Sequence, residues 1–168
     1  MPLMPRDLDE VSALCAQGRH AEALRLCAAF VAEHPDHPHG YHLRAVVRML
    51  MGEGGLALAD RDKVVSLCPT LPGAYMARAE DHLRLGDFAA AAADLDRAEK
   101  HDDGHYWPMI PLLRAHCRAR LGDYAAAEAD CARVPDGYLL PDFGAGVPAG
   151  AQALRAEIVA LQAETQKG

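Results

Sequence analysis

Histidines are concentrated in one short stretch of the chain, and imidazole is a common ligand of zinc and nickel. Four of the nine histidines, with one aspartate among them, fall within nine residues: His34, Asp36, His37, His39 and His42. A metal site is therefore one hypothesis for this stretch. Pro35 and Pro38 interrupt it, however, and such a spacing seldom forms the tetrahedron that zinc prefers. We favour a solvated turn and expect no cofactor, with the four histidines as secondary metal candidates.

Side chains that could act as nucleophiles have no partners at a recognisable spacing. The two serines, Ser12 and Ser66, do not lie on a glycine-flanked elbow of the hydrolase kind. No cysteine is accompanied by a histidine and an orienting acid at the spacing that thiol catalysis uses. A glycine-rich phosphate-binding loop is also missing. The sequence therefore predicts a protein that is not an enzyme.

Composition argues against two further classes of partner. The formal net charge is −7, whereas a protein that binds nucleic acid needs a basic face to neutralise phosphates. No stretch approaches the ~20 apolar residues that a membrane helix needs, and the amino terminus lacks the apolar core of a secretory signal. The five cysteines form no close pairs, which is typical of reduced thiols. We expect a cytoplasmic protein with neither nucleic-acid binding nor membrane insertion.

The elements that position these side chains follow a repeat, which is the first feature to seek in any sequence. Gly18, Gly52 and Gly86 are 34 residues apart, and Gly122 follows after 36. Each glycine is expected to end a helix, because a left-handed backbone is favourable for a residue without a side chain. Five residues after each glycine comes an alanine, namely Ala23, Ala57, Ala91 and Ala127. Small residues at fixed positions suit helices that pack closely.

Further residues recur in register with the glycines. Tyr41, Arg44 and Ala45 recur as Tyr75, Arg78 and Ala79, Leu85-Gly86-Asp87-Phe88 recurs as Leu121-Gly122-Asp123-Tyr124, and Pro35 and Pro69 close the first two units. In combination this pattern resembles the tetratricopeptide repeat, whose unit is a pair of antiparallel helices. The resemblance covers about residues 4–135. It implies an all-α fold, a right-handed α-α superhelix (a solenoid) of about nine helices that forms a single domain over residues 1–168.

The repeats are expected at about residues 4–37, 38–71, 72–105 and 108–135. An irregular loop rich in helix breakers follows at 136–148, and a last helix is expected at about 149–166, with Leu154, Ile158 and Leu161 on one face. A solenoid needs an end cap with a polar outer side, and this helix is the candidate. We expect the loop to anchor the cap. The alternative is that the loop folds toward a groove in which a partner binds, and that it controls access to this groove.

One arginine and one aspartate recur together in three of the four units. The arginine lies on the first helix of each pair and the aspartate 16 residues later, on the second: Arg44 and Asp60, Arg78 and Asp94, Arg114 and Asp130. The first unit lacks both residues, with Glu10 and Leu26 in their places. We predict a bidentate ion pair in each of the three units. These six residues are therefore expected to hold the helix pairs together and not to bind a partner.

The resemblance also implies where a partner would bind. In related proteins the first helices line a concave groove that binds peptides or extended segments. The positions expected to face the groove combine apolar residues, two of them methionines, with histidines, and arginines lie toward the rim: His39, His42, Val46, Met49, Met76, Glu80, Leu83, Arg84, Leu112, His116 and Arg120. Members that bind chaperone tails hold the terminal carboxylate with lysine, asparagine and arginine. The equivalent positions here, among them Gly73 and Ala77, carry none of these, and the chain has no asparagine.

Three hypotheses for function follow from these observations. The first is a non-enzymatic, cytoplasmic adaptor or chaperone-like scaffold, which binds a peptide or helix of another protein in the groove. Methionine adapts to irregular partners, so a helix or an apolar peptide is the expected ligand, whereas a carboxylate tail is not. The second is a structural repeat protein that buries apolar surface by forming homo-oligomers. The third is a metal-binding accessory protein that uses the cluster from His34 to His42.

Overall fold

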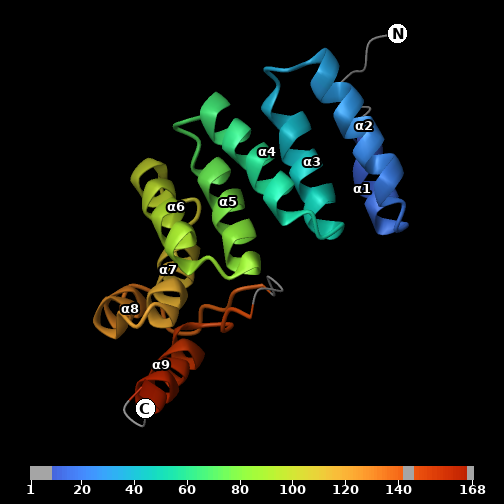
Figure 1. The fold of residues 1–168 in the computed structure, drawn as a ribbon. Coiled ribbons are helices and arrows are strands. Elements are labelled where there is room, and N and C mark those ends of the chain that lie inside the picture. Colours follow the sequence, from blue (N-terminus) through green and yellow to red (C-terminus); the bar gives the residue numbers. More distant parts are fainter. Residues whose placement is uncertain (1–8, 142–145, 166–168) are drawn as a thin grey trace. The chain divides into compact units, whose positions relative to one another are not determined.

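The computed structural model describes residues 9–141 and 146–165, and within these ranges every regular element is a helix (Figure 1). The nine helices of the described ranges are α1 (Asp9–Ala16), α2 (His20–Glu33), α3 (Pro38–Leu50), α4 (Gly54–Leu67), α5 (Pro72–Leu85), α6 (Phe88–His101), α7 (Met109–Arg120), α8 (Tyr124–Cys131) and α9 (Ala151–Thr165). The predicted all-α fold is confirmed, and each expected repeat range contains one pair of helices. None of the described helices is long and apolar enough to span a membrane.

The helices belong to two compact units, Met1–Thr70 and Leu71–Gly168. In the first unit α1, α2 and α3 each pack against the next helix in the chain, and in the second unit α5 to α8 do the same. Helix α9 packs against both α7 and α8. The boundary between the units falls where the second repeat was expected to end. That both units belong to one domain stays a prediction.

Each pair of helices turns on a glycine in the left-handed conformation. The φ angles of Gly18, Gly52, Gly86 and Gly122 are 73°, 77°, 78° and 82°. In all four turns the amide of the next residue donates to a carbonyl five residues earlier at 2.9 Å, as from Asp87 to the carbonyl oxygen of His82 in the third repeat. This bond defines the Schellman motif, which satisfies carbonyls left unpaired at a helix end. The glycines therefore end the first helices as the sequence predicted.

The interior of each pair combines small and large apolar residues. The alanines expected to bring the paired helices together (Ala45 and Ala57, Ala79 and Ala91, Ala115 and Ala127) are all fully buried. In the first unit Val11, Phe30 and Val47 are buried in one core cluster. In the second unit, Leu95 and Ile110 are among the largest fully buried side chains. The small alanines thus allow the two helices of a pair to pack closely. The larger side chains fill the remaining interior.

The predicted arginine–aspartate pairs form in all three repeats that carry them. Nε and Nη2 of Arg44 donate to the two carboxylate oxygens of Asp60 at 2.9 and 2.6 Å. The same two bonds join Arg78 to Asp94 at 2.7 and 2.6 Å. They join Arg114 to Asp130 at 2.8 and 2.7 Å. Because the aspartates are buried, each pair satisfies charges that neither helix could bury alone.

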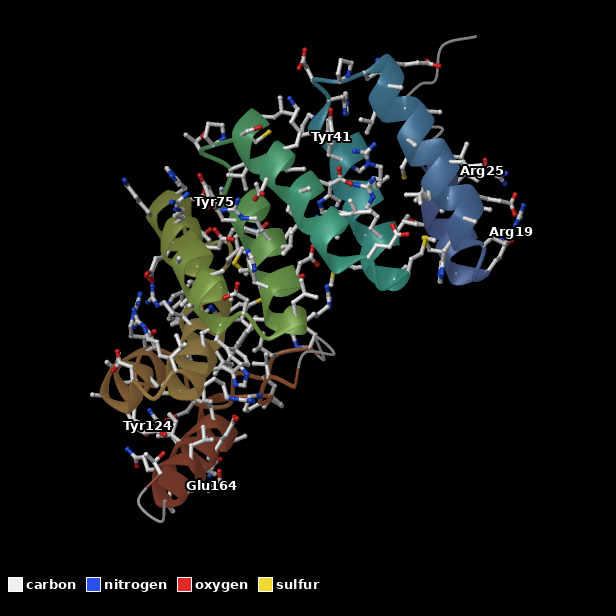
Figure 2. All side chains as sticks on the ribbon, in the orientation of Figure 1. Arg19, Arg25, Tyr41, Tyr75, Tyr124 and Glu164 are labelled. Atoms are coloured by element: carbon white, nitrogen blue, oxygen red, sulfur yellow. The ribbon has the colours of Figure 1, made fainter. Side chains whose placement is uncertain are left out.

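The surroundings of these arginines differ between repeats. Arg44 lies over the ring of Tyr41 at 5.3 Å and Arg78 over that of Tyr75 at 6.0 Å, two aromatic residues labelled in Figure 2. In the fourth repeat a proline takes the place of the tyrosine. There Arg114 instead donates from Nη1 to Asp96 at 2.7 Å and to Glu99 at 2.6 Å, both on α6. These additional carboxylates were not predicted, since they come from the neighbouring repeat.

One backbone hydrogen bond joins two parts of the segment between α8 and α9. The amide of Leu140 donates to the carbonyl oxygen of Ala149 at 2.6 Å, and the side chain of Leu140 is buried whereas that of Leu139 is exposed. Helix α9 begins at Ala151, two residues after the predicted start, because 149–150 form a bend. Gln166, where the helix was predicted to end, lies outside the described residues. That the loop anchors the cap stays a prediction.

A glycine exchange tests the turns. Gly86→Ala should lower the free energy of unfolding by about 1–2 kcal/mol, because an alanine at φ 78° meets the steric penalty of the left-handed region. Gly55→Ala is the matched control. Gly55 lies within helix α4 with nothing near the position of its Cβ, so this change should stabilise by about 0.5–1 kcal/mol. Urea denaturation of both variants measures the difference, and equal effects would contradict the assignment.

Removal of one carboxylate tests the ion pairs. Asp130→Ala should destabilise by about 3–5 kcal/mol, since it leaves the buried guanidinium of Arg114 without its bidentate partner. Asp96→Ala removes a contact of the same arginine, but the Asp96 side chain is 56% exposed against 3% for Asp130. We therefore expect its effect to stay within about 0.5 kcal/mol. Urea denaturation measures the free energy of unfolding of both variants. If both lost comparable stability, the bidentate pair would contribute no more than the exposed contact.

Candidate functional site

The eleven residues predicted to line a groove all lie on first helices of the repeats. They are His39, His42, Val46 and Met49 on α3 in the first unit, and Met76, Glu80, Leu83 and Arg84 on α5 with Leu112, His116 and Arg120 on α7 in the second unit. Their burial divides them into two sets. One set belongs to the interior, and the other remains accessible to a partner.

Four of the eleven residues predicted to line the groove are buried in this structure. Met76, Leu83, Leu112 and His116 are only 2%, 3%, 0% and 1% exposed. The physical reason is their size, because burial of a large apolar side chain stabilises a fold by about 1.5–3 kcal/mol. For His116 the ring of Phe88 contributes, with the two ring centres 5.7 Å apart. A partner-binding role for these four residues stays a prediction that would require them to be uncovered.

The accessible set combines apolar side chains with cations. On α3, His39 is exposed, and Val46 and Met49 are half-buried. In the second unit Arg84 and Arg120 are exposed. The guanidinium of Arg120 lies over the ring of Phe88 at 4.8 Å, a cation–π contact that holds it in place. Glu80 and His42, the remaining predicted residues, are half-buried.

The side chain of Arg61 contacts the imidazole of His42. Nη1 of Arg61 lies 2.8 Å from Nδ1 of His42. Since a guanidinium can only donate hydrogen bonds, Nδ1 is the acceptor, and the neutral ring carries its proton on Nε2. His39 stacks on His42 with ring centres 6.3 Å apart. The planes of the two rings differ by only 10°, so the pair lies stacked near the start of α3.

The other histidines of the predicted metal cluster contact aromatic rings. Phe30 lies 4.6 Å from the ring of His34 and 5.3 Å from that of His37. Within residues 9–141 and 146–165, no three His, Cys, Asp or Glu side chains are grouped in a way that could hold a metal ion. The metal hypothesis therefore gains no support from the arrangement of His34, His37, His39 and His42.

Three of the thiols are buried and poor nucleophiles. Burial raises the pKa of Cys27 and Cys131 to about 11 and that of Cys117 to about 12. Nearby arginines lower these pKa values by less than burial raises them. At neutral pH the three side chains are therefore protonated and act as small apolar residues.

Exposed apolar side chains form a feature that the sequence reasoning missed. Leu50, Met51 and Leu56 in the first unit are exposed, as are Leu85 and Leu121 in the second. Met51, Leu85 and Leu121 share the position directly before the turn glycine. A comparison of that position between repeats could have identified them. The single tryptophan, Trp107, is also exposed, just before α7.

A tyrosine covers the start of α5, which was also not predicted. The hydroxyl oxygen of Tyr106 lies only 2.7 Å from the place that a Cβ of Gly73 would occupy. The backbone amide of Tyr106 donates to the carboxylate of Asp102. Burial, Asp102 and Glu80 all raise the pKa of the phenol, so it remains neutral. Position 73, where chaperone-tail binders have a clamp residue, is therefore filled from a different part of the chain.

No protein-family model matches the chain, and no curated protein has a significantly similar sequence. Solved structures are similar in fold. The crystal structure of MamA has a TM-score of 0.67 and 15% identity, with 94% of this chain and 97% of that one covered. A thermophilic TPR protein of Thermus thermophilus has a TM-score of 0.60 and 22% identity, with 95% and 81% covered. The TPR2B domain of yeast Sti1, in a pHsp70 complex, has a TM-score of 0.57 and 20% identity, with 74% and 98% covered.

These likenesses confirm the tetratricopeptide-repeat fold that the sequence pattern predicted. At identities of 15–22% they speak for the fold alone, since one fold hosts many functions. The fold by itself identifies no partner, so the chemistry of a bound segment must be argued from the side chains that each unit presents.

A double-mutant cycle tests the contact between Tyr106 and Gly73. Gly73→Ala should destabilise because its methyl group would meet the Tyr106 hydroxyl, which lies at 2.7 Å whereas the adjoining ring carbon lies at 3.7 Å. Tyr106→Phe removes that oxygen, so Gly73→Ala should become neutral or stabilising in the Tyr106→Phe background. We expect a coupling energy of about 1 kcal/mol from thermal unfolding of the four proteins. Additive effects would contradict the contact.

Proposed function

We propose that this chain is a protein-interaction adaptor that binds a segment of a partner protein on the first helices of its repeats. The observation that carries the proposal is the fold, because the TPR2B domain of yeast Sti1, which is similar in fold, was solved in a complex with pHsp70. Stacked helix pairs expose a long surface relative to their core, and solenoids commonly use it for binding. The adaptor is cytoplasmic and chaperone-like, without catalytic activity and without a nucleic-acid partner.

The accessible side chains suggest the chemistry of the bound segment. On α3 the half-buried Val46 and Met49 and the stacked pair of His39 and His42 favour apolar contacts. Methionine adjusts its shape at low energetic cost. An amphipathic helix or an apolar peptide satisfies this surface better than a charged one does. In the second unit Arg84 and Arg120 are exposed cations, so a segment bound to that unit is expected to carry acidic residues.

The bound segment differs from a carboxylate tail. A terminal carboxylate needs a fixed cluster of donors, and the positions equivalent to part of that cluster are Gly73 and Ala77. Neither side chain can donate a hydrogen bond. Tyr106 additionally occupies the space beside Gly73. We therefore propose recognition of an internal segment of the partner.

A second candidate function is self-association, which one observation favours. Leu50, Met51 and Leu56 are all exposed, and they fall in one stretch of seven residues that includes the turn between α3 and α4. Grouped exposed apolar side chains commonly mark interaction sites. If copies of the chain meet at this turn, the protein is a structural building block and not an adaptor.

Paired substitutions separate the binding surface from the rest of the molecule. Val46→Glu with Met49→Glu on α3 should reduce partner recovery from a lysate by about tenfold or more, because carboxylates would be desolvated in the interface. The matched control is Ala59→Glu with Ser66→Glu, which adds the same charge to exposed positions of α4. Quantitative mass spectrometry compares the captured proteins. Equal recovery with both variants, each confirmed as folded by circular dichroism, would rule out the α3 surface.

Light scattering after size-exclusion chromatography distinguishes the two candidates. The adaptor should elute with the 18.1 kDa mass of one chain at micromolar concentration. A mass of two or more chains that Leu50→Glu with Leu56→Glu returns to one chain would instead support self-association at the apolar turn.

A further inference from the structure

Helix α9 is held by few buried side chains. Of its described residues only Leu154 and Ile158 are buried, whereas α7, against which it packs, contributes nine buried residues. Two polar contacts of α9 are at the surface: Arg155 to Glu128 at 3.2 Å and Thr165 to Tyr124 at 3.2 Å. Surface contacts of this kind stabilise little. The docking of α9 is therefore sensitive to any change at its buried face.

An unusual polar residue lies at that face. His116 of α7 is 1% exposed, and among the described residues neither of its ring nitrogens has a hydrogen-bond partner. Its Nδ1 lies 3.5 Å from Oε2 of Glu157 on α9, and this oxygen also lacks a hydrogen bond. Buried polar groups are nearly always hydrogen-bonded, so exceptions call for an explanation. The two unsatisfied groups face each other across the contact between α7 and α9.

The charges around His116 act in opposite directions. Burial is the largest influence and lowers the pKa of His116, the carboxylate of Glu157 on α9 raises it, and Arg120 at the end of α7 lowers it. From α6 the ring of Phe88 contacts the imidazole without contributing a charge. The balance keeps the docked imidazole neutral.

We propose that the docking of α9 is linked to proton uptake at His116, so that acidification releases this helix from α7. Protonation would place a charge in a buried interface, where the single carboxylate of Glu157 compensates it only in part. Water would solvate the same charge fully once α9 has left. The released state is therefore the one that binds the proton.

The direction of the effect follows from linkage. In the released state His116 titrates near its ordinary pKa of about 6.5, whereas in the docked state its pKa is lowered. Above the ordinary value both states are neutral, and docking is independent of pH at this group. Below it the released state holds the additional proton, so the docking equilibrium weakens by up to about tenfold for each unit of pH. Docking is thus present at neutral pH and is lost as the pH falls.

Hydrogen exchange measured by mass spectrometry tests the proposal on the whole chain. Amide protection of α9, corrected for intrinsic exchange, is compared at pH about 7.5 and about 5.5, on either side of the ordinary histidine pKa. We expect protection of α9 to fall up to about tenfold at the lower pH and that of α6 in the same unit to stay unchanged. With His116→Leu, which keeps the interface apolar, α9 should lose no protection. The control His105→Leu removes an exposed histidine and should respond like the natural chain.

Two further results decide between this inference and its opposite. Glu157→Gln removes the group that favours the protonated ring, so its loss of α9 protection at low pH should exceed that of the natural chain. If protonated His116 instead strengthened docking through an ion pair with Glu157, protection of α9 would rise on acidification, and the proposal would be overturned. A titration of the His116 ring by NMR gives an answer that does not depend on a variant. Its midpoint should lie below about 6.5, and a midpoint at or above this value would contradict the proposal.

Discussion

The bidentate bond between one arginine and one aspartate is the constraint on which three of the four helix pairs depend. A guanidinium and a carboxylate meet in a single planar arrangement, so the bond sets both the separation and the rotation of the two helices that carry them. Either charge left alone in the interior would oppose folding. The first pair of helices lacks the bond, and there Val11 and Phe30 are part of an apolar core cluster. The repeats thus use two different ways to hold equivalent helices.

The fourth repeat shows how the bond is adapted when its surroundings change. Pro111 stands where the earlier repeats have a tyrosine, so Arg114 has no ring to lie on. Its free edge instead donates to Asp96 and Glu99 of α6, and Glu99 in turn accepts from Arg133. A contact that is internal to a repeat in α3 and α4 therefore becomes a link between repeats in the second unit. The additional carboxylates balance the additional arginines, so the network carries little net charge.

The sequence predicted the features that depend on residues in fixed register. It did not predict the features that depend on contacts between segments distant in the chain. The glycine turns and the arginine–aspartate pairs need only local geometry, which recurs every 34 residues. The burial of His116 and Leu112 depends on the segments that cover α7. One of these segments is α9, and because it follows a loop without periodicity, the repeat pattern does not predict its position. The placement of Tyr106 against Gly73 likewise comes from an irregular connection. The accessible surface was therefore predicted less well than the helices that carry it.

The Schellman turns have a consequence for how such a chain can evolve. Each turn fixes its geometry through one glycine and two backbone hydrogen bonds, and backbone groups are the same in every residue. Within this chain the glycine recurs in all four repeats and the charged pair in three, whereas most other positions change from repeat to repeat. Mutations can accumulate at those positions over long descent without loss of the helix pairs. Neighbouring repeats of one gene can then diverge until shape, and not sequence, records their common origin.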